Sequence, residues 1–188
     1  ERAVKLKPNS VSARLNLGAI YMEYLNYKQA DRQYSAALKL EPNNLEALTG
    51  YALAAEGLRD PKKAAELYER VLSKDPERNA LLVRLALIYE KAPFNDGAKA
   101  IKYWKRYKDA AQLPPGAAVK AERDAARLEL QKAKKKRVRR KERAAHKEML
   151  AKLTEKETKL SLKYKNVLAI ESRIMAIEQG MKLEKEAR

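Results

Sequence analysis

The sequence has no cysteine, a single histidine, and only one phenylalanine and one tryptophan among its 188 residues. The absence of cysteine excludes disulfide bonds and thiolate metal sites within this chain. The histidine, His146, has only Glu142 one helical turn before it, whereas a catalytic base needs an oriented partner and a pocket. The six glycines are too scattered to form a phosphate-binding loop. We therefore expect no catalytic, cofactor-binding or metal-binding residues, and we predict that the chain is not an enzyme.

Long apolar runs are also missing, and no stretch approaches the 18 or more residues of a membrane-spanning helix. There is no signal peptide, but residues 1–10 have the pattern of the end of a helical hairpin that starts before Glu1. We expect the chain to be a fragment of a longer protein. The missing signal then says nothing of the compartment, and both the cytoplasm and a bacterial periplasm stay open.

Charge is abundant and unevenly distributed along the chain. Charged residues make up 36% of the sequence, against a usual fraction of about 25%. The formal net charge is +17, of which residues 1–116 contribute +6 and residues 117–188 contribute +11. The C-terminal part is therefore the basic part of the chain.

A repeat with a period of 34 residues organises the first part of the chain. The prolines Pro8, Pro42 and Pro76 are 34 residues apart, and other positions recur at the same offset. These recurring pairs are Ala3 and Ala37, Leu17 and Tyr51, Ala30 and Ala64, and Tyr34 and Tyr68. Within one unit the apolar residues keep helical spacings of three and four in two runs, and the second run ends before Pro42. A period of this length indicates stacked helical hairpins.

The residues at these positions are typical of one family. The first unit has Leu17, Gly18, Tyr21, Ala30, Tyr34, Ala37 and Pro42 at the signature positions. The chain resembles the tetratricopeptide repeat family over residues 1–113. The second unit departs from the pattern at Ala55, where the family usually has a large aromatic residue, and at Val71, where it usually has alanine. The third unit needs two extra residues in its turn, residues 93–97, to place Ala100 and Trp104 in the alanine and aromatic slots.

These boundaries predict an all-α protein, with a superhelix of tetratricopeptide-type hairpins followed by a long basic helix with coiled-coil character. Residues 1–10 end a preceding repeat, and residues 11–44, 45–78 and 79–113 form three hairpins. A linker, residues 112–116, leads to a capping helix at 117–131. We expect its Ala121, Ala125 and Leu128 to pack against the third repeat, because repeat arrays need a shield for their last apolar face.

The basic extension, residues 132–188, has two parts. Residues 132–147 hold ten Lys or Arg and one acid, so this run is a solvated helix or is frayed. Apolar residues then recur every seven positions in residues 149–181, which predicts a helix-pairing seam. The seam residues are Leu153, Leu160, Val167, Ile170, Ile174, Ile177 and Met181. A capping-box pattern begins at Thr154, so the tail is one long helix or two helices with a break near Thr154, and we favour two.

The resemblance implies that the first helix of each hairpin lines a partner-binding groove. Candidate groove residues are Arg14, Asn16, Glu46, Thr49, Leu53, Arg84 and Leu87. Some relatives hold acidic tails of chaperones with fixed Lys, Asn and Arg residues, but of those slots only Arg84 matches here, which argues against that mode. The basic-patch candidates are Lys134, Lys135, Lys136, Arg137, Arg139, Arg140 and Lys141.

What the family resemblance implies is a protein–protein interaction scaffold or adaptor within a larger complex. It would bind a peptide or helix in the groove and a protein partner through the C-terminal helix, and residues 149–181 could also pair with a second copy. The basic run fits an acidic protein or an anionic membrane surface. The alternative is a nucleic-acid-binding protein that uses residues 132–147, although no aromatic residues are interleaved for base stacking. A third interpretation is a bacterial envelope-associated assembly factor.

Overall fold

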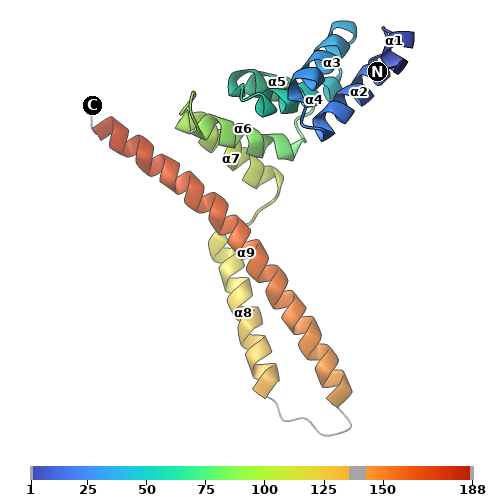
Figure 1. Cartoon of the computed structure of the whole chain (residues 1–188). Coiled ribbons are helices and arrows are strands. Elements are labelled where there is room, and N and C mark those ends of the chain that lie inside the picture. Colours follow the sequence, from blue (N-terminus) through green and yellow to red (C-terminus); the bar gives the residue numbers. More distant parts are fainter. Residues whose placement is uncertain (1, 136–142, 187–188) are drawn as a thin grey trace. The chain divides into compact units, whose positions relative to one another are not determined.

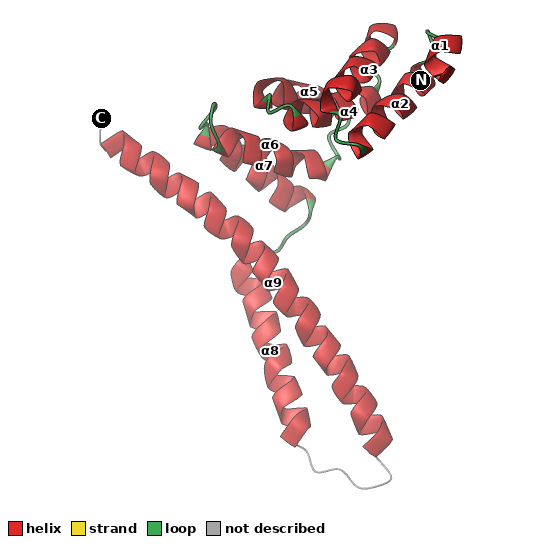
Figure 2. Ribbon diagram, viewed as in Figure 1, coloured by secondary structure: helices red, strands yellow, loops and turns green. Residues whose placement is uncertain are grey.

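The computed structural model describes residues 2–135 and 143–186, and these residues form helices and no strand (Figures 1 and 2). The helices are α1 (Arg2–Leu6), α2 (Val11–Glu23), α3 (Tyr27–Leu40), α4 (Leu45–Gly57), α5 (Pro61–Lys74), α6 (Asn79–Glu90), α7 (Gly97–Ala110), α8 (Gly116–Lys135) and α9 (Arg143–Glu186). The prediction of an all-α protein with helical-hairpin repeats is confirmed. The chain divides into two compact units, Glu1–Tyr107 and Lys108–Arg188.

The first unit is a series of helical hairpins. Helix α2 pairs with α3 and α4 pairs with α5, while α3 packs on α4 of the next hairpin. Polar residues at the predicted turns start the helices, because their side chains accept hydrogen bonds from free N–H groups of the first turn. Ser10 caps α2, Asn44 caps α4 and Asp60 caps α5. The turn chemistry therefore fixes where these three helices begin, whereas α6 begins after Arg78 without a side-chain cap.

Each hairpin turn contains one residue in the left-handed region. Leu25, Arg59 and Asn95 have φ values of 55°, 58° and 46°. Leu25 and Arg59 are one repeat period apart, and Asn95 follows after the same period plus the two inserted residues. This conformation lets the next amide reach back across the helix end, as Asn26 N–H does to the Tyr21 carbonyl at 2.8 Å.

The core of the first unit consists of alanines and large aromatic residues at equivalent repeat positions. Ala30, Ala64 and Ala100 have no exposed surface, and the aromatic positions Tyr34, Tyr68 and Trp104 are 6%, 0% and 5% exposed. The Tyr34 ring lies against Gly18 of α2 and Gly50 of α4. A Cβ atom on Gly18 would lie 2.8 Å from Tyr34 Cζ, and a Cβ on Gly50 would come even closer to the same ring. Tyr34 therefore links the first hairpin to the second through space that only glycine leaves open.

The two-residue insertion of the third hairpin is packed by an aromatic cluster. The rings of Tyr89 in α6 and Tyr103 in α7 are stacked with centroids 5.8 Å apart, and Phe94 of the inserted turn lies 4.8 Å from Tyr89. Both tyrosine hydroxyls donate to Glu69 Oε1 of α5, each at 2.8 Å. Burial, followed by this hydrogen bond to Glu69, raises the pKa of both tyrosines.

The second unit is an antiparallel pair of helices. Gly116, at the start of α8, contacts Glu171 of α9, while Glu129 near the end of α8 contacts Lys156. The tail therefore forms two helices, but the predicted break near Thr154 is wrong. Thr154 lies inside α9, and its hydroxyl donates to the Leu150 carbonyl at 2.8 Å, one turn earlier, instead of capping a helix.

Helix α8 packs on α9 with a different face from the one that was predicted to pack against the third repeat. The buried residues of α8 are Gly116, Val119, Ala126 and Leu130. The predicted residues Ala121, Ala125 and Leu128 are exposed. The alanine-rich helix offers two apolar faces, and the larger aliphatic residues decide which one packs on α9. The helix also runs to Lys135, past the predicted boundary at residue 131, while its role as a cap for the array stays a prediction.

The packing of Tyr34 gives a stability prediction. Tyr34→Ala and Tyr68→Ala should each lower the free energy of unfolding by about 3–5 kcal/mol, because each empties a large aromatic slot. Gly50→Ala should cost about 1–3 kcal/mol through overpacking against Tyr34. Urea unfolding followed by far-UV circular dichroism measures these changes. Ala19→Gly, at an exposed position of α2, serves as the control and should cost about 1 kcal/mol through helix propensity alone. A loss below about 1 kcal/mol in both tyrosine variants would mean that the repeat register is misassigned.

Candidate partner-binding surfaces

The predicted groove residues lie on the first helices of the hairpins, α2, α4 and α6. Asn16, Glu46 and Arg84 are exposed, and none of the other predicted groove residues is fully buried. The half-buried ones are Arg14, Thr49, Leu53 and Leu87. These side chains are therefore accessible, at least in part, on the surface of the three first helices.

The groove residues Arg14 and Thr49 already make hydrogen bonds to other groups of the chain. The Arg14 guanidinium donates from Nε and Nη2 to the Pro8 carbonyl, at 2.9 and 2.6 Å. Thr49 Oγ1 donates to the Leu45 carbonyl at 2.7 Å and accepts from Arg78 Nη1 at 3.2 Å. These bonds hold both side chains in fixed orientations. Arg14 and Thr49 therefore contribute mainly to the shape of the surface, and fewer of their hydrogen-bond donors are left for a partner.

Arg84 and Leu87 are brought together in one cavity. The cavity has a volume of about 270 Å³ and is lined by Glu56, Pro61, Arg84, Leu87, Ile88, Lys91 and Ala92. Arg84 Nη1 pairs with Glu56 Oε2 at 2.7 Å across neighbouring first helices. The Tyr68 hydroxyl is fully buried near this pair, and burial, with a smaller contribution from Glu56, raises the pKa of Tyr68. The cavity thus combines an apolar wall with an ion pair at its edge.

The sequence reasoning missed five of these lining residues, namely Glu56, Pro61, Ile88, Lys91 and Ala92. Glu56 lies in the last turn of α4, 28 residues before its partner Arg84. A separation of 28 residues is six less than the 34-residue repeat period, so the contact between Glu56 and Arg84 can be foreseen only if the register of the stack is known. The offset between repeats could have suggested this pair once the hairpins were assigned.

The predicted helix-pairing seam follows the less exposed side of α9. Val167 and Ile174 are buried, and Leu153, Leu160, Ile170, Ile177 and Met181 are half-buried. Over residues 153–167 the chain itself supplies a pairing helix, because α8 packs on α9. Whether the seam also binds a second chain stays a prediction.

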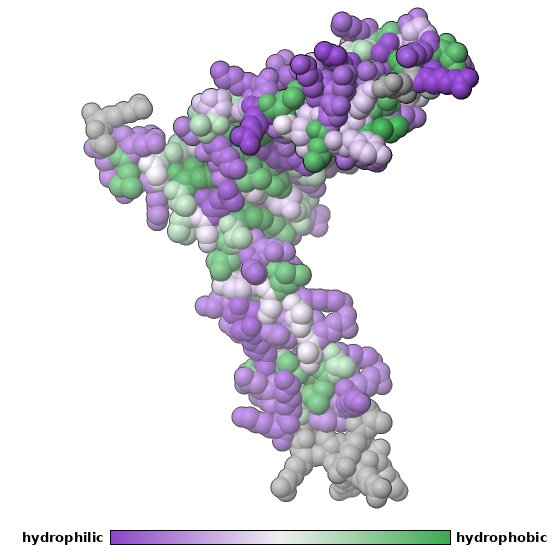
Figure 3. All heavy atoms as spheres, viewed as in Figure 1, coloured by the Kyte–Doolittle hydropathy of each residue, from purple (hydrophilic) through white to green (hydrophobic). Residues whose placement is uncertain are grey.

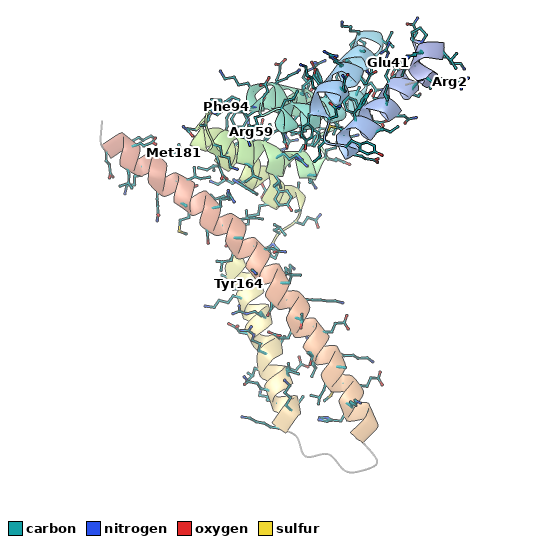
Figure 4. The ribbon with its side chains drawn as sticks, viewed as in Figure 1. Arg2, Glu41, Arg59, Phe94, Tyr164 and Met181 are labelled. Carbon is teal, nitrogen blue, oxygen red and sulfur yellow. The ribbon has the colours of Figure 1, made fainter. Side chains whose placement is uncertain are left out.

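Polar residues hold much of this helix pair together, and the heptad pattern did not reveal them. Glu157 accepts from Arg127 Nε at 2.6 Å, and the Arg123 guanidinium lies 4.3 Å from the centroid of the Tyr164 ring (Figure 4). Lys156 and Lys163 occupy the second seam position in the earlier heptads of α9, and both are exposed. A heptad search looks for apolar residues. It therefore misses a side of the helix pair that is formed by Glu157, Tyr164 and Glu171.

Glu171 fastens the base of the hairpin. Its Oε1 accepts from Lys108 Nζ at 2.5 Å and from the Gly116 backbone N–H at 3.1 Å. The carboxylate thereby caps the first turn of α8, where a negative charge is favoured by the helix dipole. The hydrogen bond from Lys108, followed by that from Gly116, outweighs burial and lowers the pKa of Glu171.

The basic run, residues 132–147, includes the last turn of α8 and the first residues of α9. Lys134 and Lys135 are exposed in the last turn of α8, and Lys147 is exposed in the first turns of α9. The other patch candidates, Lys136, Arg137, Arg139, Arg140 and Lys141, lie outside the described residues. Because α8 and α9 are antiparallel, Lys134, Lys135 and Lys147 all lie at the end of the hairpin opposite Glu171.

Other kinds of site have little support in the described chain. His146 is half-exposed in α9, and its predicted neighbour Glu142 lies outside the described residues. Across residues 2–135 and 143–186, His, Asp and Glu side chains form no group of three that could hold a metal ion. Over the same ranges, no helix has both the length and the apolar character for a membrane span.

The chain is similar to known repeat proteins. The tetratricopeptide repeat model matches residues 25–78 and 52–118, which together span half of the chain. Among solved structures, a crystal structure of MamA matches with a TM-score of 0.56 at 17% identity, covering 88% of this chain and 84% of that chain. A MamA fragment from Desulfovibrio magneticus RS-1 matches with a TM-score of 0.54 at 22% identity, covering 59% of this chain and 62% of that chain.

A third similar structure is PilW, described as a widely conserved type IV pilus biogenesis factor. It matches with a TM-score of 0.53 at 13% identity, covering 93% of this chain and 70% of that chain. These identities are low, so the structural similarities establish the fold alone. The chain spans about three fifths of the length of two of the MamA structures that it matches.

The Glu171 site predicts a pH-dependent stability of the hairpin. A carboxyl group whose pKa is lowered by folding stabilises the folded state above its ordinary pKa of 4.5, and this stabilisation is lost as the pH falls through the folded pKa. Glu171→Gln should cost about 1–3 kcal/mol at pH 7, because it removes a charged acceptor that is only 29% exposed. The cost should shrink as the pH falls through the lowered pKa of Glu171, because the wild-type carboxyl then becomes protonated.

Urea unfolding at pH 7 and at pH 3, with amide hydrogen exchange of residues 116–119, measures this effect. Glu148→Gln is the matched control, because the Glu148–Lys152 pair is 69% and 74% exposed and should contribute less than about 0.5 kcal/mol. Equal losses in the two variants, or a Glu171→Gln cost that does not depend on pH, would contradict the capping role.

Proposed function

Because this chain belongs to the tetratricopeptide repeat family, whose helical arrays are protein–protein interaction modules, we propose that it is a non-enzymatic scaffold that binds a protein segment on the surface of α2, α4 and α6. The observation that carries the proposal is the cavity lined by Arg84 and Leu87. It lies on the surface that the resemblance assigns to partner binding. Its apolar wall and charged edge suit a peptide or helix with one apolar anchor.

The ion pair at the edge of the cavity favours a mixed segment over a purely acidic one. Arg84 is already neutralised by Glu56 at 2.7 Å, so an acidic ligand would have to displace that carboxylate. Leu87, Ile88 and Pro61 offer apolar contact instead. The proposed ligand therefore places an apolar side chain against these residues and hydrogen-bonds to the ion pair at the rim.

The proposed C-terminal role is a second contact within a larger complex, made by the α8–α9 hairpin. The hairpin presents Lys134, Lys135 and Lys147 at one end, and exposed lysines suit an acidic protein or an anionic membrane surface. The same residues support the alternative of a nucleic-acid contact, which would be salt-dependent and sequence-tolerant. The proposal of an envelope assembly role rests on the structural similarity to PilW, a type IV pilus biogenesis factor. It has the least support from the residues of this chain.

The groove proposal predicts a specific pattern of mutational effects. A peptide selected from a random 16-residue phage library on the full chain should bind Arg84→Glu and Leu87→Ser at least about tenfold more weakly, because both substitutions alter the cavity. Lys62→Glu, at an exposed position of α5, makes the same charge change as Arg84→Glu and should leave the affinity unchanged. Fluorescence anisotropy of the labelled peptide measures the affinities. Selected peptides that bind all variants equally well would place the binding site elsewhere.

Reversing the basic end of the hairpin tests the alternative. Lys134→Glu with Lys135→Glu should leave the affinity of the selected peptide within about twofold, because these residues belong to the other unit. The same variant is titrated with a 20-base-pair DNA duplex at two salt concentrations. If the wild-type chain binds the duplex with a Kd below about 1 µM near physiological salt, and the variant does not, the nucleic-acid function replaces the scaffold proposal for this end of the chain.

A further inference from the structure

Helix α8 has an apolar face that its packing on α9 leaves exposed. Val119, Ala126 and Leu130 are buried against α9. Ala121, Ala125 and Leu128 share another face, at helical spacings of four and three, and Leu128 is 52% exposed. This second face has the apolar pattern of a packing surface. Within the described part of the α8–α9 unit no helix covers it, and its Ala125 also lines the groove between the two helices.

The exposed face borders a groove between α8 and α9. The groove has a volume of about 740 Å³, and it is lined by Glu122, Ala125, Ala126, Glu129, Lys152, Glu155, Lys156, Lys159 and Leu160. Its floor is apolar, formed by Ala125, Ala126 and Leu160. Figure 3 shows apolar atoms exposed along the middle of this hairpin, with hydrophilic atoms on either side. The small alanine side chains leave room for another helix to approach closely.

The two rims of the groove differ in charge. The α8 rim carries Glu122 and Glu129, and the α9 rim is basic on balance, with Lys152, Lys156 and Lys159 against the single acid Glu155. The ion pairs that these residues make within the chain are exposed. Lys156 lies 3.4 Å from Glu129, with both side chains more than half exposed, and Lys159 pairs with Glu155 four residues earlier on the same helix. Such pairs contribute little and can be exchanged for new partners without a large loss.

A second copy of the hairpin has the complementary arrangement. A two-fold axis parallel to the helices places α8 of one copy over α9 of the other, so the acidic rim of each copy meets the basic rim of its partner. A two-fold axis perpendicular to the helices would instead oppose α8 with α8, and Glu122 and Glu129 would meet like charges. The charge pattern therefore selects one occupant in one orientation.

We propose that this chain forms a two-fold symmetric dimer through the Ala125–Leu160 groove, with α8 of each copy packed over α9 of the other into a four-helix bundle. The apolar contact is made between the two groove floors, by Ala125, Ala126 and Leu160 of each copy. This interface differs from the heptad seam on α9, which is in part occupied by α8 of the same chain. It is also independent of the proposed peptide site on α2, α4 and α6.

Charge exchange on the full chain tests the proposal. Variant one carries Glu122→Lys and Glu129→Lys, and variant two carries Lys156→Glu and Lys159→Glu. We expect wild-type dimers that are half-formed at roughly 10–100 µM, and a rise of at least about tenfold in the dissociation constant for each variant alone. A chain with all four substitutions, and an equimolar mixture of variants one and two, should both regain dimers, because opposite charges then face each other again.

Sedimentation equilibrium measures the dissociation constants, and far-UV circular dichroism confirms that each variant is folded. The matched control, Lys120→Glu with Lys165→Glu, changes the net charge as much as variant two at exposed positions that do not line the groove. It should keep the wild-type dissociation constant. A wild-type chain that stays monomeric at 200 µM overturns the proposal, since the groove then serves another partner. Dimers of equal strength in all the variants also overturn it, because the chain would then associate through a different surface.

Discussion

The contact on which the repeat unit depends is that of an aromatic ring with the small residues of two successive hairpins. The Tyr34 ring lies against Gly18 and Gly50, which belong to α2 and α4. A helical hairpin by itself leaves one apolar face exposed, and stacking on the next hairpin buries it. Because glycine and alanine leave the space and tyrosine or tryptophan fills it, the stack has one register, and the first helices share one surface. The cavity at Arg84 and Leu87 exists because that register brings α6 next to the end of α4.

The hairpin unit is held together by a different kind of interaction. Among its described residues few are buried, namely Gly116, Val119, Ala126, Leu130, Val167 and Ile174. Polar contacts at several levels of the helix pair add orientation, with Glu171 at one end and the Glu157–Arg127 pair further along. A pair of helices with so small a core gains from a further packing partner, since most of the stability of a helix comes from its packed face. A partner that packs on the exposed alanines of α8 would supply part of this stability.

The two units suit two kinds of contact. The repeat unit offers a preformed surface whose side chains are fixed by internal bonds, such as those of Arg14 and Thr49, and a preordered surface reduces the entropy lost on binding. The hairpin unit offers charge in abundance, with opposite signs on its two rims and lysines at one end. A scaffold that combines a rigid recognition surface with a charged, self-complementary extension could bring two copies of one partner together.

The sequence by itself determined the helical class, the helical-hairpin repeats and the core positions of the repeat unit. Proline, the capping residues and the spacing of alanine and tyrosine act locally or at a fixed period, so they can be read without knowing the tertiary structure. The groove residues followed from the same register, but the partners of Arg84 and Arg14 did not, because those contacts join residues far apart in the chain or carbonyl groups in turns. Only the tertiary structure decided where the tail turns and which face of α8 is buried. Helix α8 has two apolar faces of similar pattern, and Thr154 satisfies a capping motif as well as a bond within a helix. In such cases two local interpretations fit the sequence equally well. The packing of one helix on another decides which of them the chain adopts.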